Sequence, residues 1–185
     1  MKTIKLLAIL FISSIALSSC SKNDDPIPVN EEEIITTVTL TLTNGNDIVT
    51  LQSKDLDGDG PGAPVVTVSG NLDANTTYTG SIVLLNETES PAEDITTEVN
   101  EEGDEHQFFF SATNSLATFA YTDTDSNNDP IGITFTLTTG AAGTGDIGVI
   151  LRHEPNKSAT GVSTGDITNA GGSTDVDVSF NVTVQ

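Results

Sequence analysis

The sequence predicts an all-β fold, a single antiparallel Ig-like β-sandwich of about nine strands with one short helix near residues 91–102. Apolar residues alternate with Thr, Ser, Asn or Asp along segments 37–43, 133–138 and 176–184. Such alternation places one face of a strand in a core and the other in water, where Thr fits because it is β-branched and polar. Short strands separated by Gly, Asn and Asp turns favour an antiparallel sandwich, whereas strands of a parallel α/β sheet are apolar on both faces.

Residues 1–19 are expected to form a secretory signal peptide. Lys2 and Lys5 precede an apolar run that is shorter than the roughly 20 residues needed to span a bilayer. The run ends at Leu17, and the four residues Leu17-Ser18-Ser19-Cys20 resemble the box at which bacterial lipoproteins are cleaved and lipidated. We therefore expect a lipid anchor on Cys20, with an ordinary secreted protein as the alternative. Cys20 is the single cysteine of the chain, which excludes a disulfide within it.

Residues 20–33 are expected to form an extended acidic tether. Prolines and acidic residues dominate this segment, and such a composition buries little surface and repels itself. Its start, Ser21-Lys22-Asn23-Asp24-Asp25, resembles the acidic signal that follows the lipidated cysteine in surface lipoproteins of Bacteroidota. A plain acidic spacer is the alternative. These features predict a protein anchored to the outer membrane and exposed at the cell surface, with its sandwich domain at 34–185.

The strands expected in the sandwich domain are all short. Three are the alternating segments named above. Weaker patterns predict further strands at 47–53, 65–69, 77–87, 106–113, 116–122 and 146–153. No internal repeat and no second domain is evident in the sequence.

One segment follows the helical period instead. Ser90-Pro91-Ala92-Glu93 has the residues of a capping box, with Ser at the N-cap, Pro at the first helical position and Glu three residues after the cap. Ala92, Ile95 and Val99 follow at helical spacing, and Gly103 is suited to end the helix in the left-handed region. We expect helix 91–102 to cover one end or edge of the sandwich.

Composition excludes several functions. The 185 residues carry 6 Lys+Arg against 27 Asp+Glu, a formal net charge of −21, so the chain lacks the clustered cations that bind nucleic acid or anionic lipid. The chain has no Gly-x-Ser-x-Gly motif, and its glycine-rich segment 140–145 joins two predicted strands rather than opening a helix as a phosphate loop does. We therefore do not expect an enzyme.

Two polar loops place oxygen ligands at alternate positions. Asp55, Asp57 and Asp59 precede Gly60, a spacing that lets three carboxylates converge on a calcium ion. The loop begins like an EF-hand but has Val66 where that motif needs Glu, so a bare Asp–Gly turn is the alternative. A weaker calcium candidate repeats the spacing without the glycine, at Asp123, Asp125, Asn127 and Asp129. Calcium is the one cofactor that the loops suggest.

The two histidines are candidates by position. His106 begins one predicted strand and His153 ends another, so antiparallel pairing would put both rings at the same end of the sandwich, on the apolar faces of their strands. With Asp104 and Glu154 nearby, they form a candidate zinc or copper site. The alternative, which the sequence favours, is two rim histidines that bond to carboxylates.

A set of segments spread over nearly the whole mature chain carries a resemblance. They are NETE (86–89), EHQFFF (105–110), YTD (121–123), TLTTG (136–140), LRHEP (151–155) and GDITNAGG (165–172). They resemble a family of small flavobacterial lipoproteins, often labelled "type 1 periplasmic binding fold superfamily protein". The resemblance implies an envelope location and no particular activity. The label implies repeated strand–helix units, whereas the residues here predict strands with one helix.

Three classes of function remain. The expected anchor and tether, without a catalytic set, favour a non-enzymatic binding or adhesion module of the cell envelope whose ligand the sequence does not name. The alternative is an accessory lipoprotein that captures a metal or small nutrient for an outer-membrane transporter. An enzyme such as a glycosidase is the third. The expected partners are the membrane, through Cys20, and an outer-membrane protein, but no nucleic acid.

Overall fold

The computed structural model describes residues 33–57 and 62–185. The predicted signal peptide, Cys20, the tether up to residue 32, and Asp59 lie outside the described residues. In the part of the chain that is described, no helix is both long and apolar enough to cross a membrane.

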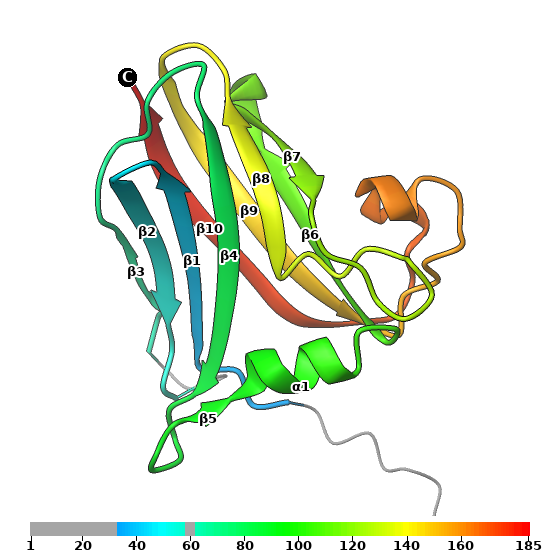
Figure 1. The fold of residues 1–185 in the computed structure, drawn as a ribbon. Coiled ribbons are helices and arrows are strands. Elements are labelled where there is room, and N and C mark those ends of the chain that lie inside the picture. Colours follow the sequence, from blue (N-terminus) through cyan, green and yellow to red (C-terminus); the bar gives the residue numbers. More distant parts are fainter. Residues whose placement is uncertain (1–32, 58–61) are drawn as a thin grey trace, which may run out of the picture. The chain divides into compact units, whose positions relative to one another are not determined.

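Two antiparallel sheets pack face to face (Figure 1). The larger sheet has the strand order β3 (Val65–Val68), β2 (Asp47–Lys54), β1 (Thr37–Asn44), β4 (Thr77–Asn86), β8 (Thr134–Thr139) and β7 (Ala117–Tyr121), with the two-residue β5 (Glu93–Asp94) beside β4. The smaller sheet has the order β10 (Ser173–Val184), β9 (Gly143–His153) and β6 (His106–Ala112). The predicted all-β sandwich is confirmed, and every predicted strand overlaps an observed one.

The core lies between the sheets and is built from the inward sides of the alternating strands. On β1, Val38, Leu40 and Leu42 are buried, while Thr39 and Thr41 between them are partly exposed. The largest fully buried side chains of the domain are Tyr78, Phe108, Phe135, Phe180, Leu40, Leu42, Leu51, Leu72, Ile82, Leu84, Leu137 and Ile147. Burying one such aliphatic or aromatic side chain contributes about 1.5–3 kcal/mol. The apolar positions of the alternating pattern are therefore the positions that form this core.

The helix is shorter than predicted. Helix α1 spans Ile95–Glu101, and its N-cap is Asp94, whose side chain accepts the Thr96 N–H at 3.0 Å. The predicted cap at Ser90 is wrong because Glu93 and Asp94 pair with the end of β4 as strand β5. Ala92 is consequently exposed, whereas Ile95 and Val99 are buried as expected.

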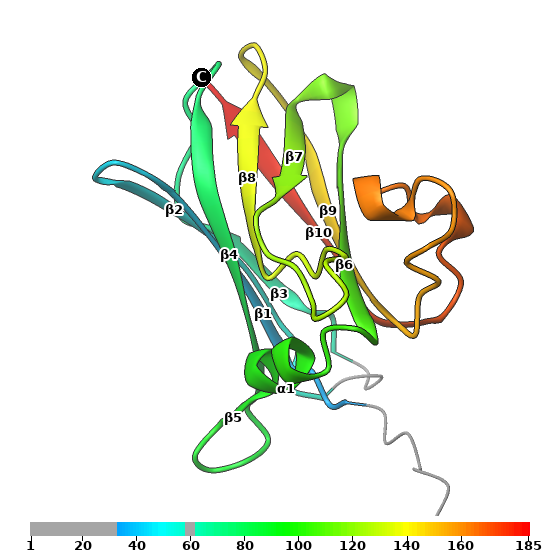
Figure 2. The ribbon, with the colours of Figure 1, turned by 45° about the vertical axis from the view of Figure 1, so that its right-hand side comes forward.

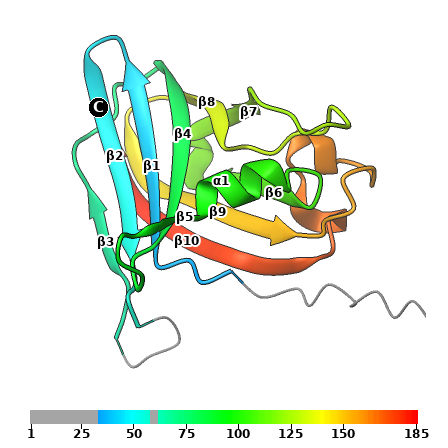
Figure 3. The ribbon, with the colours of Figure 1, turned by 60° about the horizontal axis from the view of Figure 1, so that its bottom comes forward.

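Helix α1 lies across one end of the sandwich, between the two sheets (Figure 3). The helix ends at Glu101 with Glu102 as its C-cap, and Gly103 follows without the positive φ that we predicted. A Cβ atom at Gly103 would lie 2.6 Å from Ile131 Cδ1, so any larger residue here would push the Ile131 side chain aside. The last backbone carbonyls of the helix thus lie next to the start of β6.

The outer face of β6 is covered by the connection between β9 and β10, residues 154–172, seen in orange in Figure 2. This connection contains two short 3-10 helices, η2 (Val162–Thr164) and η3 (Ile167–Asn169); a third, η1 (Thr113–Ser115), joins β6 to β7. Phe109 of β6 packs against Val162 and Ala170 in a small second core. Strand β6 is therefore buried on both faces where it begins, next to His106.

Candidate functional site

The two histidines meet at the end of the smaller sheet. Strands β6 and β9 pair antiparallel with His106 directly opposite His153. Both rings therefore lie at the same end of the sandwich, the arrangement that the sequence predicted for antiparallel pairing. Their rings stack with centroids 4.8 Å apart and planes inclined by 12°. His106 is 1 % exposed and His153 is 9 % exposed. Two imidazoles that are stacked and buried at the end of an apolar strand face do not fit the alternative of two histidines at a solvated rim.

A backbone hydrogen bond sets the tautomer of His106. Its Nδ1 lies 3.1 Å from the carbonyl oxygen of Glu102, at the end of α1, and a carbonyl can only accept. Nδ1 therefore carries a proton, and in the neutral ring Nε2 presents a lone pair. Nε2 is buried and has no hydrogen-bond partner among the described residues. A backbone carbonyl that holds one ring nitrogen while the other stays open is the usual arrangement of a metal-binding histidine.

The charge state of His106 fits the same role. Burial is the largest influence and lowers the pKa of its imidazole, and it outweighs the bond to Glu102, which raises the pKa. The neutral ring is therefore favoured near pH 7, and metals bind the neutral form.

A third candidate ligand, Asp175, comes from β10. Its neighbour Val176 faces the core, so strict alternation would turn Asp175 outward. The pairing of β10 with β9 shifts between Thr174 and Val176, and Asp175 is the extra residue of this β-bulge. The bulge brings its carboxylate to the histidines: one ligand atom each from His106, His153 and Asp175 lie within 4.8 Å of one another.

A fourth candidate ligand, a carboxylate, comes from the start of the described chain. Glu33 Oε1 lies 3.4 Å from His106 Nε2, and Glu33, Glu102 and His106 form a second compact set of ligand atoms. Desolvation is the main cause that raises the pKa of Glu33 to about 7, and the nearby charge of Asp175 adds to it. Burial and crowding thus keep the Glu33 carboxyl group from ionising freely.

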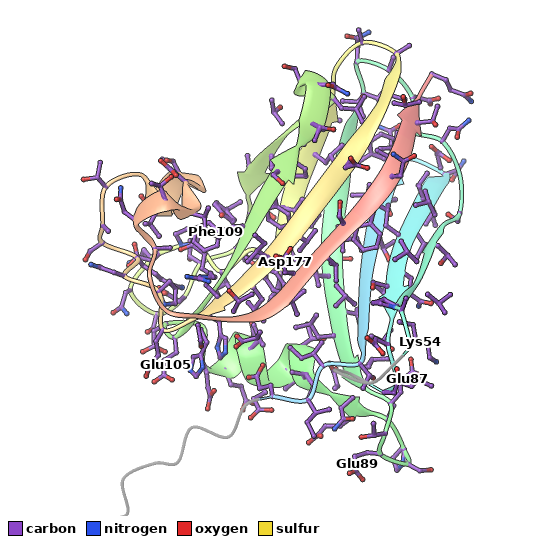
Figure 4. The ribbon with its side chains drawn as sticks, turned by 180° about the vertical axis from the view of Figure 1, so that it is seen from behind. Lys54, Glu87, Glu89, Glu105, Phe109 and Asp177 are labelled. Carbon is purple, nitrogen blue, oxygen red and sulfur yellow. The ribbon has the colours of Figure 1, made fainter. Side chains whose placement is uncertain are left out.

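More carboxylates flank the solvent side of His153. Its Nε2 lies 3.6 Å from Glu105 Oε2, and Glu105, His153 and Glu154 form a third set of ligand atoms (Glu105 is labelled in Figure 4). Of the two acids predicted to lie beside the histidines, Glu154 does and Asp104 belongs to none of the three sets. The exposure of Glu105 and Glu154 makes this set the weakest of the three.

An open acidic groove adjoins the buried cluster. Its volume is about 550 Å³, and its lining includes Glu33 and Asp175 together with Asp55, Asp57 and Asp177. The apolar part of the lining includes Ile35, Val38, Val176 and Val178. The carboxylates on this lining favour a cation that approaches Glu33 or Asp175 from solvent through the groove.

The first predicted calcium loop borders this groove. Asp57 accepts the Gly62 N–H at 3.1 Å and donates its own N–H to Asp55 Oδ1 at 3.3 Å. These bonds describe an Asp–Gly turn, and they leave the carboxylates of Asp55 and Asp57 on the groove. Asp59 lies outside the described residues, so a calcium ion held by Asp55, Asp57 and Asp59 stays a prediction.

The second predicted calcium loop holds a lysine instead. The Lys157 ammonium donates to Asp125 Oδ2 at 2.8 Å, to the Pro130 carbonyl at 3.0 Å and to the Gly103 carbonyl. Asp125 Oδ1 also accepts the N–H groups of Asn127 and Asp129. A cation is therefore already surrounded by oxygen atoms here.

The first acid of that loop is engaged as well. Both oxygens of Asp123 accept backbone N–H groups, from Gly132 at 2.7 Å and from Thr134 at 2.8 Å. Calcium needs six to eight oxygen ligands, and the carboxylates of Asp123 and Asp125 are occupied. We do not propose a calcium site at Asp123, Asp125, Asn127 and Asp129.

Sequence reasoning missed two residues of the histidine cluster. Asp175 was missed because its position in the alternation predicts an exposed side chain, and the sequence does not reveal the bulge. Glu33 was assigned to the acidic tether, and no local signal sets it apart from Glu31 and Glu32. Both residues reach the histidines only through long-range packing.

Comparison of the chain with protein-family models, with curated proteins and with solved structures finds no match.

Proposed function

We propose that the protein is a non-enzymatic, lipid-anchored protein of the outer membrane that captures a divalent transition-metal ion, zinc or copper, for an outer-membrane transporter. The observation that carries the proposal is the buried pair His106–His153 with Asp175 beside it and with the Nε2 atom of His106 open. The sequence favoured rim histidines and a binding or adhesion module. The stacked, buried geometry shifts the balance to metal capture.

The donor set selects the class of ion. Two imidazoles with carboxylates suit zinc and copper(II), whereas calcium and magnesium take oxygen ligands only. Copper(I) prefers sulfur, and the chain has one Cys and one Met, Cys20 and Met1, both outside the described residues.

The ligand atoms already lie close together, but both the distances and the ring orientations must change for them to bind one ion. Zinc–ligand bonds of about 2.0–2.1 Å place the ligand atoms of a tetrahedral site about 3.3 Å apart. The ligand atoms of His106, His153 and Asp175 already lie within 4.8 Å of one another. The two imidazole rings are nearly parallel, at 12°, so their in-plane lone pairs do not yet converge on one point. Rotations of the two side chains must bring about this convergence as well as the shorter distance.

Zinc is expected to stabilise the protein through this site. An ion that binds only the native state raises the free energy of unfolding by about 2.7 kcal/mol at a hundredfold excess over Kd. We expect thermal unfolding to show this gain with zinc and to show none with magnesium at equal ionic strength. In His106→Asn, the side-chain amide keeps a donor for the Glu102 carbonyl but removes the Nε2 ligand, so the gain should disappear.

Asp175 and Asp177 provide a matched pair of controls. They lie two residues apart on β10, and Asp177 is exposed on the groove side (Figure 4). Asp175→Asn should weaken zinc binding, and Asp177→Asn should not. Equal stabilisation by zinc and magnesium, or zinc binding by His106→Asn at parental strength, would return the histidines to a purely structural role.

The envelope location has its own test. Cys20→Ala should move the protein from the membrane fraction to the soluble fraction, because it removes the acyl chains that anchor a lipoprotein stably. Protease added to intact cells should digest the parent protein if it faces the outside. Unchanged membrane association of Cys20→Ala would refute the anchor, and full protection from protease would place the domain on the periplasmic side.

A further inference from the structure

The Glu33 side chain is more buried than an acidic side chain in a solvated tether would be. Its side chain is 11 % exposed, and its Oε2 atom is buried without a hydrogen-bond partner among the described residues. An unpaired polar group in such a place costs free energy, and an ionised one costs more. Burial of this side chain therefore indicates a partner of positive charge or a proton.

The contact between Glu33 and His106 also calls for a positive charge or a proton. His106 donates through Nδ1 to the Glu102 carbonyl, so its Nε2 lone pair faces the Glu33 carboxyl group. Two lone pairs repel each other unless something positive lies between them. The 3.4 Å separation is longer than the 2.7–2.9 Å typical of a charge-assisted hydrogen bond, and it leaves both atoms available to a shared ion.

The neighbours of Glu33 add negative charge. Asp175, Glu98 and Glu102 all act on its carboxyl group as nearby negative charges. One bound divalent cation would offset this crowding for several carboxylates at once. A proton on Glu33 would relieve only one of them.

We propose that Glu33 is a ligand of the ion held by His106, His153 and Asp175, so that metal binding fastens the segment 33–36 to the end of the smaller sheet. This inference rests on the proposed function. The ligand atom of Glu33 is grouped with those of Glu102 and His106, so its carboxylate must turn toward His153 and Asp175 when the ion binds. The ion would then have two imidazole and two carboxylate ligands, a coordination number of four that suits zinc. This arrangement also makes the residues that lead from the tether into the domain part of the metal site.

The acidic groove supplies the route to this site. Glu33 and Asp175 line the groove, so the two carboxylate ligands are the ones that an incoming ion meets first. The histidines lie behind them, at 1 % and 9 % exposure. The ion thus enters past Glu33, and its binding then holds Glu33 in place.

The test compares the parent protein with Glu33→Gln and Glu89→Gln. Glu89 is exposed in the loop after β4, well apart from Glu105, which flanks His153 (Figure 4), and supplies the same chemical change as a control. Zinc titration by calorimetry at constant ionic strength should show at least about tenfold weaker binding for Glu33→Gln, since even an outer-shell partner contributes 10–100-fold. Glu89→Gln should bind as the parent does.

Amide hydrogen exchange gives a second readout. Zinc should slow exchange in the peptide that covers residues 33–36 of the parent and of Glu89→Gln, but not of Glu33→Gln. If the parent binds zinc and Glu33→Gln binds it equally, with equal protection of residues 33–36, Glu33 is not a ligand and only this inference fails. If the parent binds no zinc, the proposed function fails and this inference fails with it.

Discussion

Replacing Lys157 with methionine is expected to lower the free energy of unfolding by about 3–5 kcal/mol, the usual cost of removing one partner of a buried ion pair. The Lys157 and Asp125 side chains are 6 % and 1 % exposed. Methionine fills most of the space but leaves the Asp125 carboxylate and the carbonyls of Gly103 and Pro130 without their donor. Urea unfolding at pH 7 would measure the change.

The loss should depend on pH in a defined direction. Burial raises the pKa of Asp125, but the hydrogen bonds from Lys157 and from the Asp129 and Asn127 amides outweigh it and lower the pKa below that of the unfolded chain. A lowered pKa contributes stability that is complete above the unfolded value of about 3.9 and is lost as the pH falls through the folded value. The difference between parent and Lys157→Met should therefore be largest near neutral pH and should shrink in acid.

Lys54→Met is the control for this effect. Lys54 pairs with Glu87 at the surface, where the two side chains are 36 % and 26 % exposed (Figure 4). Exposed ion pairs contribute about 0–1 kcal/mol. A loss of equal size for Lys54→Met and Lys157→Met would show that the buried ammonium has no special role in holding α1 and the 123–130 loop.

Gly172→Ala is expected to destabilise the fold by about 2–5 kcal/mol and to weaken zinc binding as well. Gly172 has φ +70°, and a Cβ atom there would lie 2.1 Å from the carbonyl oxygen of His153. The left-handed backbone costs a non-glycine residue about 1–2 kcal/mol, and relief of the clash costs about 1–3 kcal/mol more. The clash moves the backbone of His153, so the geometry of the site should change with it.

Gly171→Ala separates the two contributions. Gly171 also has a positive φ, +64°, but a Cβ atom there meets nothing within 4 Å. It should cost only the conformational part, about 1–2 kcal/mol, and leave zinc affinity unchanged. Melting curves and zinc titrations of both variants would show this, and identical behaviour of the two would contradict the proposed coupling between Gly172 and His153.

The strands were predictable because their signal is local. Alternation along β1, β8 and β10 is visible within a few residues. The positions of His106 at the start of one predicted strand and His153 at the end of another placed both rings at one end of the sandwich on condition that these strands pair antiparallel, and they do. The start of the helix was not predictable in the same way. Ser90 to Glu93 satisfied a local capping rule, but pairing of Glu93 and Asp94 with β4 took precedence.

The site depends on interactions that local patterns do not encode. A bulge of one residue in β10 reverses the side of the strand on which Asp175 lies. Lys157 occupies the centre of the loop that resembled a calcium site, 32 residues away in sequence from Asp125. Glu33 contacts His106 although β1 to β5 and helix α1 lie between them in the sequence. Spacing along the sequence can identify ligands that lie on one segment. In this cluster, each ligand comes from a different segment.

The most direct measurement is a crystal structure of the zinc-soaked protein, with anomalous diffraction recorded on both sides of the zinc absorption edge. We predict one strong zinc peak at the end of the smaller sheet, about 2.0–2.1 Å from His106 Nε2 and from a ring nitrogen of His153, with the Asp175 carboxylate completing the contact. Histidine rings that remain stacked at 4.8 Å with no zinc peak between them and Asp175 would contradict the proposal that this protein captures a metal ion.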